Sequence, residues 1–554
     1  MRPHLTSFVL VVAIPASLSA QDAATLRPRI DQIFAQYTPS SPGCAVGLAK
    51  DGRTLYTHGY GSANLEYGVP LTDSTVLESG SVAKQFTASA LVLLAQDGKL
   101  SLDDDIHKYL PEVPDFGGQR IAIRNLLTHT SGLRDQWGLL AIEGLGPGTQ
   151  VHTPMTTLDL VAHQKMLNFP PGSEYLYSNT GYVLAGLIVQ RVSGKSLDEF
   201  TRERLFQPLG MRHTEWRADF TKVVPNRATA YSGSADRGFR QDMPFTNMIG
   251  NGGVLSTMSD LLRWNENLDH PSVGGQPYVD AMQTRMRLTT GRTITYALGL
   301  EVVDYDGVRE VGHGGSTAGY RTYLARYPDQ RVSVAVWCNY AGSNAQQLAR
   351  RVADLVLTKP QRAAAQAGAA KVTLAAADLA RWAAVYRDPH TDQAVALTVD
   401  GDGLTTGRGR GAMALSPLGG ARFHSPQGQA TFSGAPGHGA FILARTSGDT
   451  SRFDEVPAAP PTVATSDYVG TYASDELDVK LIVAAKEGKL VLRRRPADEF
   501  ELRPVYLDDF ATQAIPGEQG IGTLRFARDA SGKVSGFSIY AGRVLDVRFT
   551  RVPR

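Results

Sequence analysis

The sequence predicts an α/β (α+β) fold, in which helices flank an antiparallel sheet that carries an all-helical insertion, followed by two small antiparallel β-barrels. Three observations lead to this prediction. Strand-like segments near residues 44–60 and 296–338 are separated by a long stretch of helices and Gly/Pro-rich loops. After an Ala-rich linker, residues 362–371, the composition changes to short strands and turns. That last part repeats one pattern, which indicates two copies of a small β unit.

Length and charge limit the possible functions. At 554 residues the chain is longer than one core usually supports, so we expect several domains. Lys and Arg number 56 and Asp and Glu 54, which leaves a formal charge of +2 without a dense basic run. Binding of nucleic acid therefore has no electrostatic support. The expected partner is a small molecule or a short peptide, with cell-wall material among the candidates, and the oligomeric state is not predicted.

The N-terminus has the make-up of a secretory signal. Arg2 precedes the apolar run Leu5–Leu18, and small residues follow up to Ala20, which predicts a signal peptide over residues 1–20. The run is shorter than the roughly 20 residues that span a bilayer, and Pro15 interrupts it, so no stable membrane span is expected. We therefore expect a periplasmic or secreted protein.

The first elements can be placed in order. An amphipathic helix is expected over Leu26–Tyr37, because its apolar residues fall on one side. A hairpin should follow, with strands Cys44–Ala49 and Thr54–Tyr60 joined by Asp51-Gly52, a dipeptide that tolerates the positive φ of a tight turn. The segment Ser81–Gln96 carries an apolar stripe typical of a helix.

The domain should end in strands and a helix. From Tyr296 to Cys338 the pattern predicts three strands, separated by Asp306-Gly307 and Pro328-Asp329. A helix over Asn344–Leu357 would then close the unit, so that the terminal helices cover one face of the sheet. We place this domain at residues 21–360.

Two cysteines, Cys44 and Cys338, are present, which excludes a disulfide scaffold and a multi-cysteine zinc site. Both lie in apolar, strand-like runs. Buried thiols are the favoured interpretation, and a single disulfide in an oxidising compartment is the alternative.

The C-terminal part repeats itself. Trp382–Tyr386 matches Tyr468–Tyr472, and further pairs of segments recur at spacings of 84 to 87 residues. Closed antiparallel barrels suit this length because closure removes exposed strand edges. We therefore predict one barrel at residues 372–456 and a second at residues 466–554, with a Pro-rich segment between them.

Ser81 and Lys84 form the first candidate catalytic motif. They lie three residues apart at a helix start, so both side chains project from one face. Cleavage of an amide or ester by a serine needs a deprotonated hydroxyl, a proton carrier and donors for the oxyanion. Lys84 accepts a proton only when neutral, and burial lowers a lysine pKa in that direction. Tyr177 is a second candidate base, and we treat the two as a coupled pair without choosing between them.

Two further motifs supply binding groups. Asn179 has an amide that can donate to a substrate carbonyl and accept from Lys84. Gly314 and Gly315, which follow His313, leave space for a substrate backbone along a strand edge, and the amide of Ser316 is a candidate second oxyanion donor. Each motif alone is common by chance. The three in this order favour a serine acyl-transfer enzyme.

Other chemistry lacks support in the sequence. The twelve histidines show no metal-ligand spacing, and no Gly-x-Ser-x-Gly elbow is present, so neither a metal nor another cofactor is expected. His129 is interpreted as a loop residue held by hydrogen bonds rather than as a base.

At these motifs, and at Leu126–Leu133 (Leu-Leu-Thr-His-Thr-Ser-Gly-Leu), the chain resembles the serine β-lactamase and penicillin-binding protein superfamily. The branch it is similar to contains class C β-lactamases, D-alanyl-D-alanine carboxypeptidases and D-aminopeptidases (peptidase S12 type). The resemblance covers about residues 25–357. It implies a β-lactamase-like catalytic domain in which the strands carrying the two cysteines are neighbours. The roles that it implies are a nucleophile at Ser81, proton carriers at Lys84 and Tyr177, a polar positioner at Asn179, and a cleft-lining strand at His313, Gly314, Gly315 and Ser316.

One departure from the superfamily pattern narrows the substrate. Many relatives have Lys-Thr-Gly where this chain has His313-Gly314-Gly315. A histidine is mostly neutral above its pKa and suits a substrate carboxylate less than an ammonium does, which disfavours penicillins and carboxypeptidase action. D-aminopeptidases resemble the chain here and also carry two C-terminal β-barrels.

The sequence therefore predicts an exported serine hydrolase that acts through an acyl-enzyme on amide or ester bonds, with D-amino-acid peptides or amides as preferred substrates. A carboxylesterase, or a weak β-lactamase or D,D-carboxypeptidase, is the alternative within enzymes. A non-catalytic cell-wall-binding protein is the alternative from another class.

Overall fold

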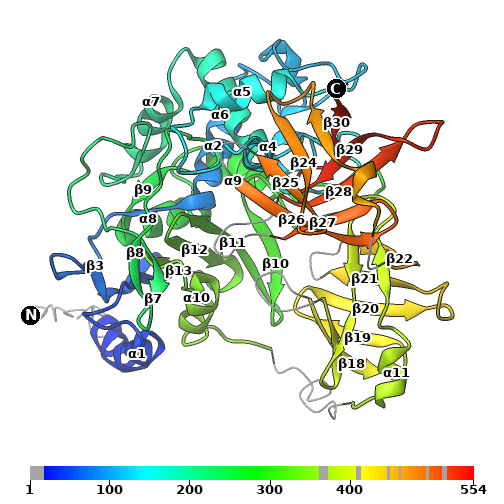
Figure 1. Cartoon of the computed structure of the whole chain (residues 1–554). Coiled ribbons are helices and arrows are strands. Elements are labelled where there is room, and N and C mark those ends of the chain that lie inside the picture. Colours follow the sequence, from blue (N-terminus) through cyan, green and yellow to red (C-terminus); the bar gives the residue numbers. More distant parts are fainter. Residues whose placement is uncertain are drawn as a thin grey trace, which may run out of the picture.

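A computed structural model describes residues 18–360, 372–406, 413–445, 450–460, 463–494, 498–513 and 521–553. Within these ranges the chain forms an N-terminal domain with a mixed helix and sheet architecture and two β-barrels that lie beside each other at one side of it (Figure 1). The predicted signal peptide, apart from its last three residues, and the Ala-rich linker fall outside the described residues.

The N-terminal domain is built on a six-stranded antiparallel sheet in the order β10-β11-β12-β13-β1-β2. Its strands are β1 (Cys44–Lys50), β2 (Arg53–Tyr60), β10 (Glu301–Tyr305), β11 (Val308–Thr317), β12 (Tyr320–Tyr327) and β13 (Val332–Cys338). The first and last parts of the domain meet in the middle of the sheet, where β1 pairs with β13 along its whole length.

The prediction of three strands between Tyr296 and Cys338 was wrong, because four strands form there. The missed turn joins β11 to β12 with two residues, Ala318 and Gly319. Ala318 adopts a positive φ of 45°, a conformation for which an alanine gives no warning in the sequence. The predicted separators at Asp306-Gly307 and Pro328 do mark the other two turns.

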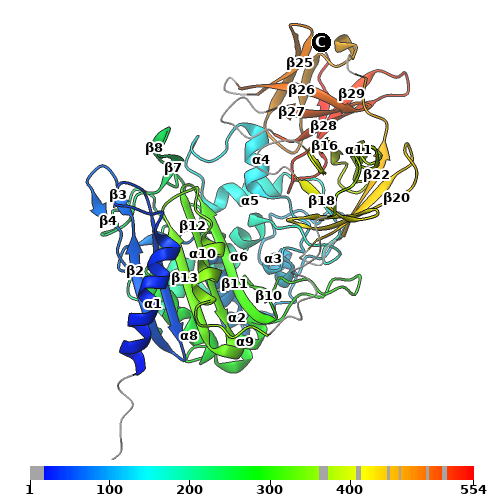
Figure 2. The same cartoon turned by 90° about the horizontal axis from the view of Figure 1, so that it is seen from below.

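One face of the sheet is covered by the two terminal helices, as predicted. α1 (Leu18–Phe34) and α10 (Ala345–Ala353) pack their apolar sides on this face and run along it in Figure 2. The Asn344 side chain accepts a hydrogen bond from the amide of Gln347 and so caps α10. α10 ends four residues before the predicted Leu357.

The opposite face packs against the insertion. At its centre lies α2 (Lys84–Gln96), which is buried from Lys84 to Leu94 and is preceded by the 3₁₀ turn η1 (Gly80–Ala83). The other helices are α3 (Ile123–Leu127), α4 (Gln136–Glu143), α5 (Pro154–Ala162), α6 (Asn179–Ser193), α7 (Leu197–Thr201), α8 (Met258–Asp269) and α9 (Gly275–Gln283).

Short elements complete the insertion. They are the helical turns η2 (Ile106–Lys108) and η3 (Arg202–Phe206), and the strands β3 (Ser62–Asn64), β4 (Val69–Pro70), β5 (Leu77–Glu78), β6 (Glu215–Trp216), β7 (Tyr231–Ser234), β8 (Gly238–Gln241) and β9 (Val254–Ser256). The insertion is therefore mainly helical and carries small strand pairs in addition. The turn η4 (Pro328–Gln330) belongs to the main sheet.

A disulfide joins Cys44 on β1 to Cys338 on β13. The interpretation of both residues as buried thiols was therefore wrong. The two cysteines are direct partners in the strand register and are fully buried. This register depends on how segments almost 300 residues apart pair, which the spacing in the sequence does not reveal.

The first barrel is a nine-stranded antiparallel sheet whose two edge strands, β15 and β16, are separated in the chain by Leu397 alone, so that the sheet nearly closes on itself. It follows α11 (Ala376–Ala380). Its strands are β14 (Val385–Arg387), β15 (Ala394–Ala396), β16 (Thr398–Asp400), β17 (Gly403–Thr405), β18 (Ala414–Gly419), β19 (Arg422–Ser425), β20 (Gly428–Ser433), β21 (Ala440–Arg445) and β22 (Thr450–Val456).

The second barrel is closed. It follows the turn η5 (Thr465–Asp467), and its strands are β23 (Gly470–Ala473), β24 (Lys480–Lys486), β25 (Lys489–Arg494), β26 (Asp498–Tyr506), β27 (Asp509–Gln513), β28 (Thr523–Arg528), β29 (Val534–Tyr540) and β30 (Val547–Arg551). Two small β-barrel units therefore follow the N-terminal domain, as the repeat predicted. Across the described ranges, no helix combines the length and the apolar character needed to cross a membrane.

Candidate active site

Ser81 lies in the turn η1, at the start of the buried helix α2. Gly80 has a φ of 49°, and a Cβ atom there would lie 2.5 Å from the backbone nitrogen of Ser316 on β11. A side chain at position 80 is therefore excluded both by backbone conformation and by space. The turn at Gly80 brings the N-terminus of the helix into contact with β11. Ser81 therefore lies in the cavity described below.

Lys84 reaches Ser81 from the next turn. Its Nζ lies 3.1 Å from Ser81 Oγ, 2.9 Å from Asn179 Oδ1 and 2.7 Å from the carbonyl oxygen of Asn251. The two carbonyl-type oxygens accept N–H bonds, so the third position on the nitrogen faces the Ser81 hydroxyl. In the neutral amine that position is a lone pair, which can accept the hydroxyl proton.

Burial favours the neutral amine. Lys84 is fully buried, and desolvation holds its pKa well below the ordinary 10.5, although the Asp135 carboxylate acts in the opposite direction. The Arg543 guanidinium lowers this pKa further. A lysine in this setting is suited to take up a proton at neutral pH.

Tyr177 is the second group at Ser81. Its hydroxyl hydrogen-bonds with Ser81, and Lys84 Nζ lies 4.9 Å from the ring centroid. Burial nevertheless raises the pKa of Tyr177 above its ordinary value of 10, because this effect outweighs the hydrogen bond. Burial therefore disfavours the charged form of both groups, the phenolate of Tyr177 and the ammonium of Lys84.

Asn179, the first residue of α6, connects Lys84 to the carboxylate of Asp135, a residue that was not predicted to belong to the site. Its backbone N–H and its Nδ2 both donate to Asp135 Oδ2, at 2.7 and 2.9 Å, while its Oδ1 accepts from Lys84. Asp135 also caps α4 by accepting from the amide of Trp137 at 3.0 Å. The only signal in the sequence was a polar Arg134-Asp135 pair directly after the motif that ends at Leu133.

His129 positions the loop that carries Tyr177, in line with its interpretation as a loop residue. Its Nδ1 accepts from the backbone N–H of Ser178 at 3.1 Å, and the two ring centroids of His129 and Tyr177 lie 4.0 Å apart. Burial holds the pKa of His129 well below 6.5, so the imidazole is neutral at neutral pH. A neutral ring packs against the phenol without adding charge to the site.

His313 is also a neutral, buried group. Its Nδ1 lies 2.5 Å from the carbonyl oxygen of Gly314, so that nitrogen carries the proton, and its Nε2 accepts from the Tyr296 hydroxyl at 2.7 Å. Burial lowers the pKa of His313 to about 3. At neutral pH the residue therefore provides no cation for a substrate carboxylate.

Gly315 allows β11 to approach the nucleophile. A Cβ atom at Gly315 would lie 2.0 Å from the carbonyl oxygen of Ser79 and 3.0 Å from the backbone nitrogen of Ser81. Together with the contact at Gly80, this brings the backbone nitrogens of Ser81 and Ser316 to the same end of the cavity. Two N–H donors in this arrangement match the requirement for an oxyanion hole.

A cavity of about 1060 Å³ opens over these groups. Its lining includes seven of the eight residues that the sequence predicted for the site: Ser81, Tyr177, Asn179, His313, Gly314, Gly315 and Ser316. The eighth, Lys84, lies beneath Ser81 and is reached through it. The structure thus brings all eight predicted residues together.

Arg543, from the second barrel, completes one wall of the cavity. It lies in the loop between β29 and β30, with its guanidinium carbon 4.6 Å from the Tyr177 ring centroid and Nη1 4.0 Å from Asp135 Oδ2. No motif or spacing in the sequence marks Arg543, because its role depends on how the barrel docks.

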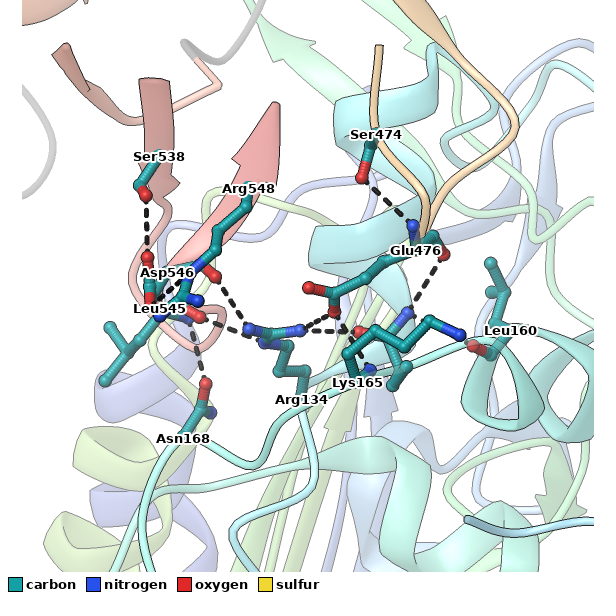
Figure 3. A network of polar contacts seen from close by, with 11 residues as sticks. Arg134, Leu160, Lys165, Asn168, Ser474, Glu476, Ser538, Leu545, Asp546 and Arg548 are labelled. Carbon is teal, nitrogen blue, oxygen red and sulfur yellow. Dashed lines mark hydrogen bonds and ion pairs between the residues drawn. The ribbon is translucent and has the colours of Figure 1, made fainter. Parts of the chain in front are cut away.

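A buried polar network holds this loop in place (Figure 3). Arg134 forms an ion pair with Glu476 of the second barrel and donates to the carbonyl oxygens of Leu545 and Asp546, at 2.9 and 2.8 Å. Asn168 donates to the carbonyl oxygen of Arg543 at 3.0 Å. Arg134 directly precedes Asp135, so the barrel contact and the Asn179 contact share one short segment.

Among the described residues, no group of three or more His, Cys, Asp or Glu side chains is arranged to hold a metal ion. The chemistry that the site supports from the chain itself is acyl transfer: a hydroxyl, a buried amine with a lowered pKa, a buried phenol and two backbone donors surround one point.

Comparison with known proteins agrees with this geometry. The family model described as Beta-lactamase matches residues 30–359. A D-aminopeptidase of Brucella anthropi is 26% identical over 94% of this chain and 98% of its own length. The structure of the octameric penicillin-binding protein homologue from Pyrococcus abyssi is similar with a TM-score of 0.56 and 23% identity, over 86% of this chain and 99% of that one. The structure of a D-stereospecific amidohydrolase from Streptomyces sp. gives a TM-score of 0.50 and 25% identity, over 59% and 97%.

Proposed function

Because this chain belongs to the beta-lactamase family and is a serine hydrolase, we propose that it releases N-terminal D-amino acids from short peptides or amides through an acyl-enzyme on Ser81. The observation that carries the reaction is the contact between Lys84 and Ser81, 3.1 Å long, at a fully buried amine. The two oxygens that take the other N–H bonds leave this amine one direction in which to accept a proton.

The proposed acylation assigns a role to Ser81, Lys84, Tyr177 and the two backbone donors. Neutral Lys84 takes the hydroxyl proton as Ser81 Oγ forms a bond to the substrate carbonyl carbon. The backbone N–H groups of Ser81 and Ser316 stabilise the oxyanion. The carbon–nitrogen bond then breaks, and the proton passes from Lys84 through the Tyr177 hydroxyl to the leaving amine. A water molecule repeats these steps on the acyl-enzyme, with Ser81 as the leaving group.

Two observations support the choice of substrate. The similarity to D-aminopeptidases extends over nearly the whole chain, including both barrels. His313 is neutral, so the site offers no permanent cation on β11 for the carboxylate of a penicillin or of a C-terminal residue. Both observations favour a substrate recognised by its N-terminal side.

Hydrolysis of four chromogenic substrates tests the proposal: D-alanine p-nitroanilide, its L-enantiomer, p-nitrophenyl acetate and a chromogenic cephalosporin. We expect the D-anilide to be preferred over the L-anilide and the cephalosporin. Cleavage of p-nitrophenyl acetate alone would indicate a carboxylesterase, and preference for the cephalosporin a β-lactamase. Ser81→Ala is the control and should abolish every activity, because the variant lacks the hydroxyl that lies 3.1 Å from Lys84 Nζ and forms the acyl-enzyme.

Mass spectrometry after treatment with a fluorophosphonate tests the nucleophile separately. The wild type should gain one adduct on Ser81 and the Ser81→Ala variant none. An equal adduct on both proteins would refute Ser81 as the nucleophile, and the absence of any adduct would favour a protein that binds cell-wall material without cleaving it.

Export is part of the proposal and rests on the N-terminal sequence alone. Expression of the full-length gene in a Gram-negative host, followed by fractionation and N-terminal sequencing, should give a periplasmic protein that begins at Gln21. An intact N-terminus in the cytoplasmic fraction would refute it.

A further inference from the structure

A second cavity, of about 510 Å³, lies outside the catalytic site and shares no lining residue with it. It is formed where the C-terminus of α8 and one side of α9 meet the beginning of β11 and the end of β12. Arg309 of this cavity precedes Ser316 by seven residues on β11, which corresponds to roughly 23 Å at the rise of a strand. The proposed reaction therefore has no use for the groups that line this cavity.

The strand register brings two arginines to the same face of the sheet at this place. Arg326 on β12 is paired with Val311 on β11, and Arg309 lies two residues before Val311, so the two arginines are diagonal neighbours. Val311 belongs to the apolar core that includes α8 and α9. The contacts agree with this, because Arg309 donates to Gln283 of α9 and Arg326 pairs with Asp269 of α8.

Arg326 forms the floor of the cavity and is 2% exposed. Its Nη1 donates to Asp269, but its Nε and Nη2 have no hydrogen-bond partner among the described residues and are shielded from solvent. These two N–H groups form one edge of the guanidinium and point in parallel, which matches two oxygens of one anion. Arg350 uses the same edge to bind both carboxylate oxygens of Glu310, at 3.0 and 2.6 Å.

The unpaired edge of Arg326 is unfavourable for the folded protein. Burial lowers the pKa of Arg326 below its usual range, and the charge of Arg309 adds to this effect, although Asp269 acts in the opposite direction. The guanidinium nevertheless keeps its charge, because an arginine is not deprotonated in proteins. An anion in the cavity would satisfy the two N–H groups and offset the repulsion between the two arginines.

Two further cations lie at the rim of the cavity. Arg309 is exposed and donates through Nη2 to Gln283 at 2.9 Å. Arg331 has a side chain that is 45% exposed, with Nε 3.5 Å from Asp51, and an exposed pair of this kind contributes little. Both side chains are long and can move, so an anion can reach Arg326 between them.

The acidic residues of the lining do not cancel these charges. Asp269 is engaged by Arg326, and Asp280 accepts a hydrogen bond from Gln276 Nε2 at 2.8 Å. Three arginines against two aspartates leave an excess of one positive charge in the lining, without counting His270. The cavity therefore favours an anion over a cation.

We propose that this cavity binds a phosphate group, either the free ion or part of a small organic phosphomonoester, with two of its oxygens on Nε and Nη2 of Arg326. A carboxylate would use both of its oxygens on that edge, whereas a phosphate has further oxygens for Arg309 and Arg331. The volume lies in the range of small-molecule sites and leaves room for an organic group. This site does not depend on the proposed function.

Isothermal titration of the purified protein with inorganic phosphate, glycerol 3-phosphate and acetate, at constant ionic strength, tests the proposal. We expect both phosphates to bind at least about 10-fold more tightly than acetate, since acetate lacks the oxygens for the rim arginines. Tighter binding of glycerol 3-phosphate would identify an organic phosphate as the ligand, and equal binding the free ion. No binding of either phosphate, or equally tight binding of acetate, would overturn the proposal.

Variants assign the binding to this cavity. Arg326→Lys keeps a charge opposite Asp269 but lacks the two-pronged edge, and it should bind phosphate about 10- to 100-fold more weakly. Arg309→Gln changes an exposed side chain, so it tests the site even if Arg326→Lys does not fold, and a two- to fivefold loss of about the size of an exposed ion pair is expected. Arg285→Gln is the matched control, because Arg285 is exposed and follows Thr284 of the lining without belonging to it. Unchanged affinity in Arg309→Gln, or an equal loss in Arg285→Gln, would refute the assignment.

Arg543→Ala distinguishes this cavity from the catalytic one, which Arg543 lines. The variant should bind phosphate with the affinity of the wild type. Loss of binding in Arg543→Ala, with Arg309→Gln unaffected, would place the anion in the catalytic cavity and overturn the proposal. Failure of the protein to hydrolyse D-alanine p-nitroanilide would refute the proposed function and leave the phosphate site as it stands, because binding is measured without turnover.

Discussion

The first barrel, β14 to β22, and the second barrel, β23 to β30, contact the N-terminal domain in different ways. The apolar core of the second barrel continues into that domain, where it includes Leu139, Leu140, Ile142 and Leu160. The core of the first barrel consists of its own residues and those just before it, from Leu374 to Phe453. Two copies of one sequence pattern therefore have different structural roles.

Their polar contacts differ in the same sense. Arg134 and Glu476, which hold the second barrel, have side chains that are 0% and 5% exposed. Among the residues that the structure describes, the first barrel contacts the N-terminal domain through His390 and Glu174, whose Nε2 and Oε1 atoms lie 3.1 Å apart and whose side chains are 51% and 41% exposed. A buried ion pair fixes geometry, whereas an exposed one contributes little to stability. The cavity lining reflects this, since Arg543 of the second barrel belongs to it and no described residue of the first does.

The largest effect is expected from Glu476→Leu, which leaves the buried Arg134 guanidinium without its counter-charge. Breaking one partner of a buried pair costs about 3–5 kcal/mol, so the variant should unfold at a clearly lower temperature and lose activity as the Arg543 loop moves. Thermal unfolding followed by circular dichroism and assays of D-anilide hydrolysis measure the two effects.

The double variant Arg134→Leu/Glu476→Leu is the control for this ion pair. It should recover part of the lost stability, because neither charge remains buried alone. Recovery stays partial because the carbonyl oxygens of Leu545 and Asp546 lose their donor. A single variant that is as stable as the wild type would show that the second barrel is held by its apolar core alone.

A smaller and opposite effect is expected from Asp509→Asn, at the side where the two barrels meet. Asp509 is 1% exposed, both of its carboxylate oxygens lack a partner among the described residues, and burial raises its pKa from 3.8 to about 6. Arg525 of the second barrel and Arg387 of the first oppose this shift. Because the folded protein binds this proton more tightly than the unfolded chain, stability falls as pH rises from about 4 to above 6.

Asp509→Asn removes the charge and should stabilise the protein at pH 7.5 by about 1 kcal/mol, which raises the midpoint of thermal unfolding by about 2–8 °C depending on the size of the unit that unfolds. The difference from the wild type should be lost at pH 4, where the wild-type carboxyl is protonated. Thermal unfolding at both pH values checks the prediction. Destabilisation by the variant at pH 7.5 would show that Arg525 and Arg387 stabilise the charged form.

Arg543→Ala should affect catalysis more than folding. The guanidinium contacts the Tyr177 ring from a half-exposed position, and such a contact is worth about 0.5–1 kcal/mol, or a two- to fivefold loss in kcat/KM. Its charge also lowers the pKa of Lys84. Removing it raises that pKa, so the acid limb of the pH profile of kcat/KM should move to higher pH.

Arg525→Ala is the matched control, because Arg525 belongs to the same barrel but pairs with Asp392 of the first barrel. It should leave the pH profile unchanged. Equal shifts in both variants would mean that Arg543 acts through the docking of the barrel rather than through its charge at the site.

The second barrel also shows which parts of the site the sequence could predict: relations between residues close in the chain were found, and contacts made by docking were missed. Ser81 and Lys84 were found because one helix start places them together, so their relation is local. The repeat of short strands was found because it depends on spacing along the chain. Arg543 and Asp135 were missed because they join the site through docking and through a hydrogen bond to α6. The Cys44–Cys338 disulfide depends in the same way on a register between distant strands.

The fourth strand of the region from Tyr296 to Cys338 was missed for a local reason. The turn between β11 and β12 uses Ala318 at a positive φ, and the sheet pairing on both sides, not the preference of an alanine, holds it there. The dipeptides Asp306-Gly307 and Pro328-Asp329 revealed the other two turns, because glycine tolerates a positive φ and proline fixes its own φ at a value that suits a turn.

The smallest effect is expected at the first barrel. His390→Ala removes an ion pair whose two side chains are about half exposed, and exposed pairs contribute about 0–1 kcal/mol. The variant should therefore unfold within about 2 °C of the wild type and keep its kcat/KM for the D-anilide. Glu174→Gln removes the same pair from the other side and should behave alike. A loss of stability close to that of Glu476→Leu would mean that the first barrel is held as firmly as the second. The exposure of the His390–Glu174 contact would then not indicate its strength.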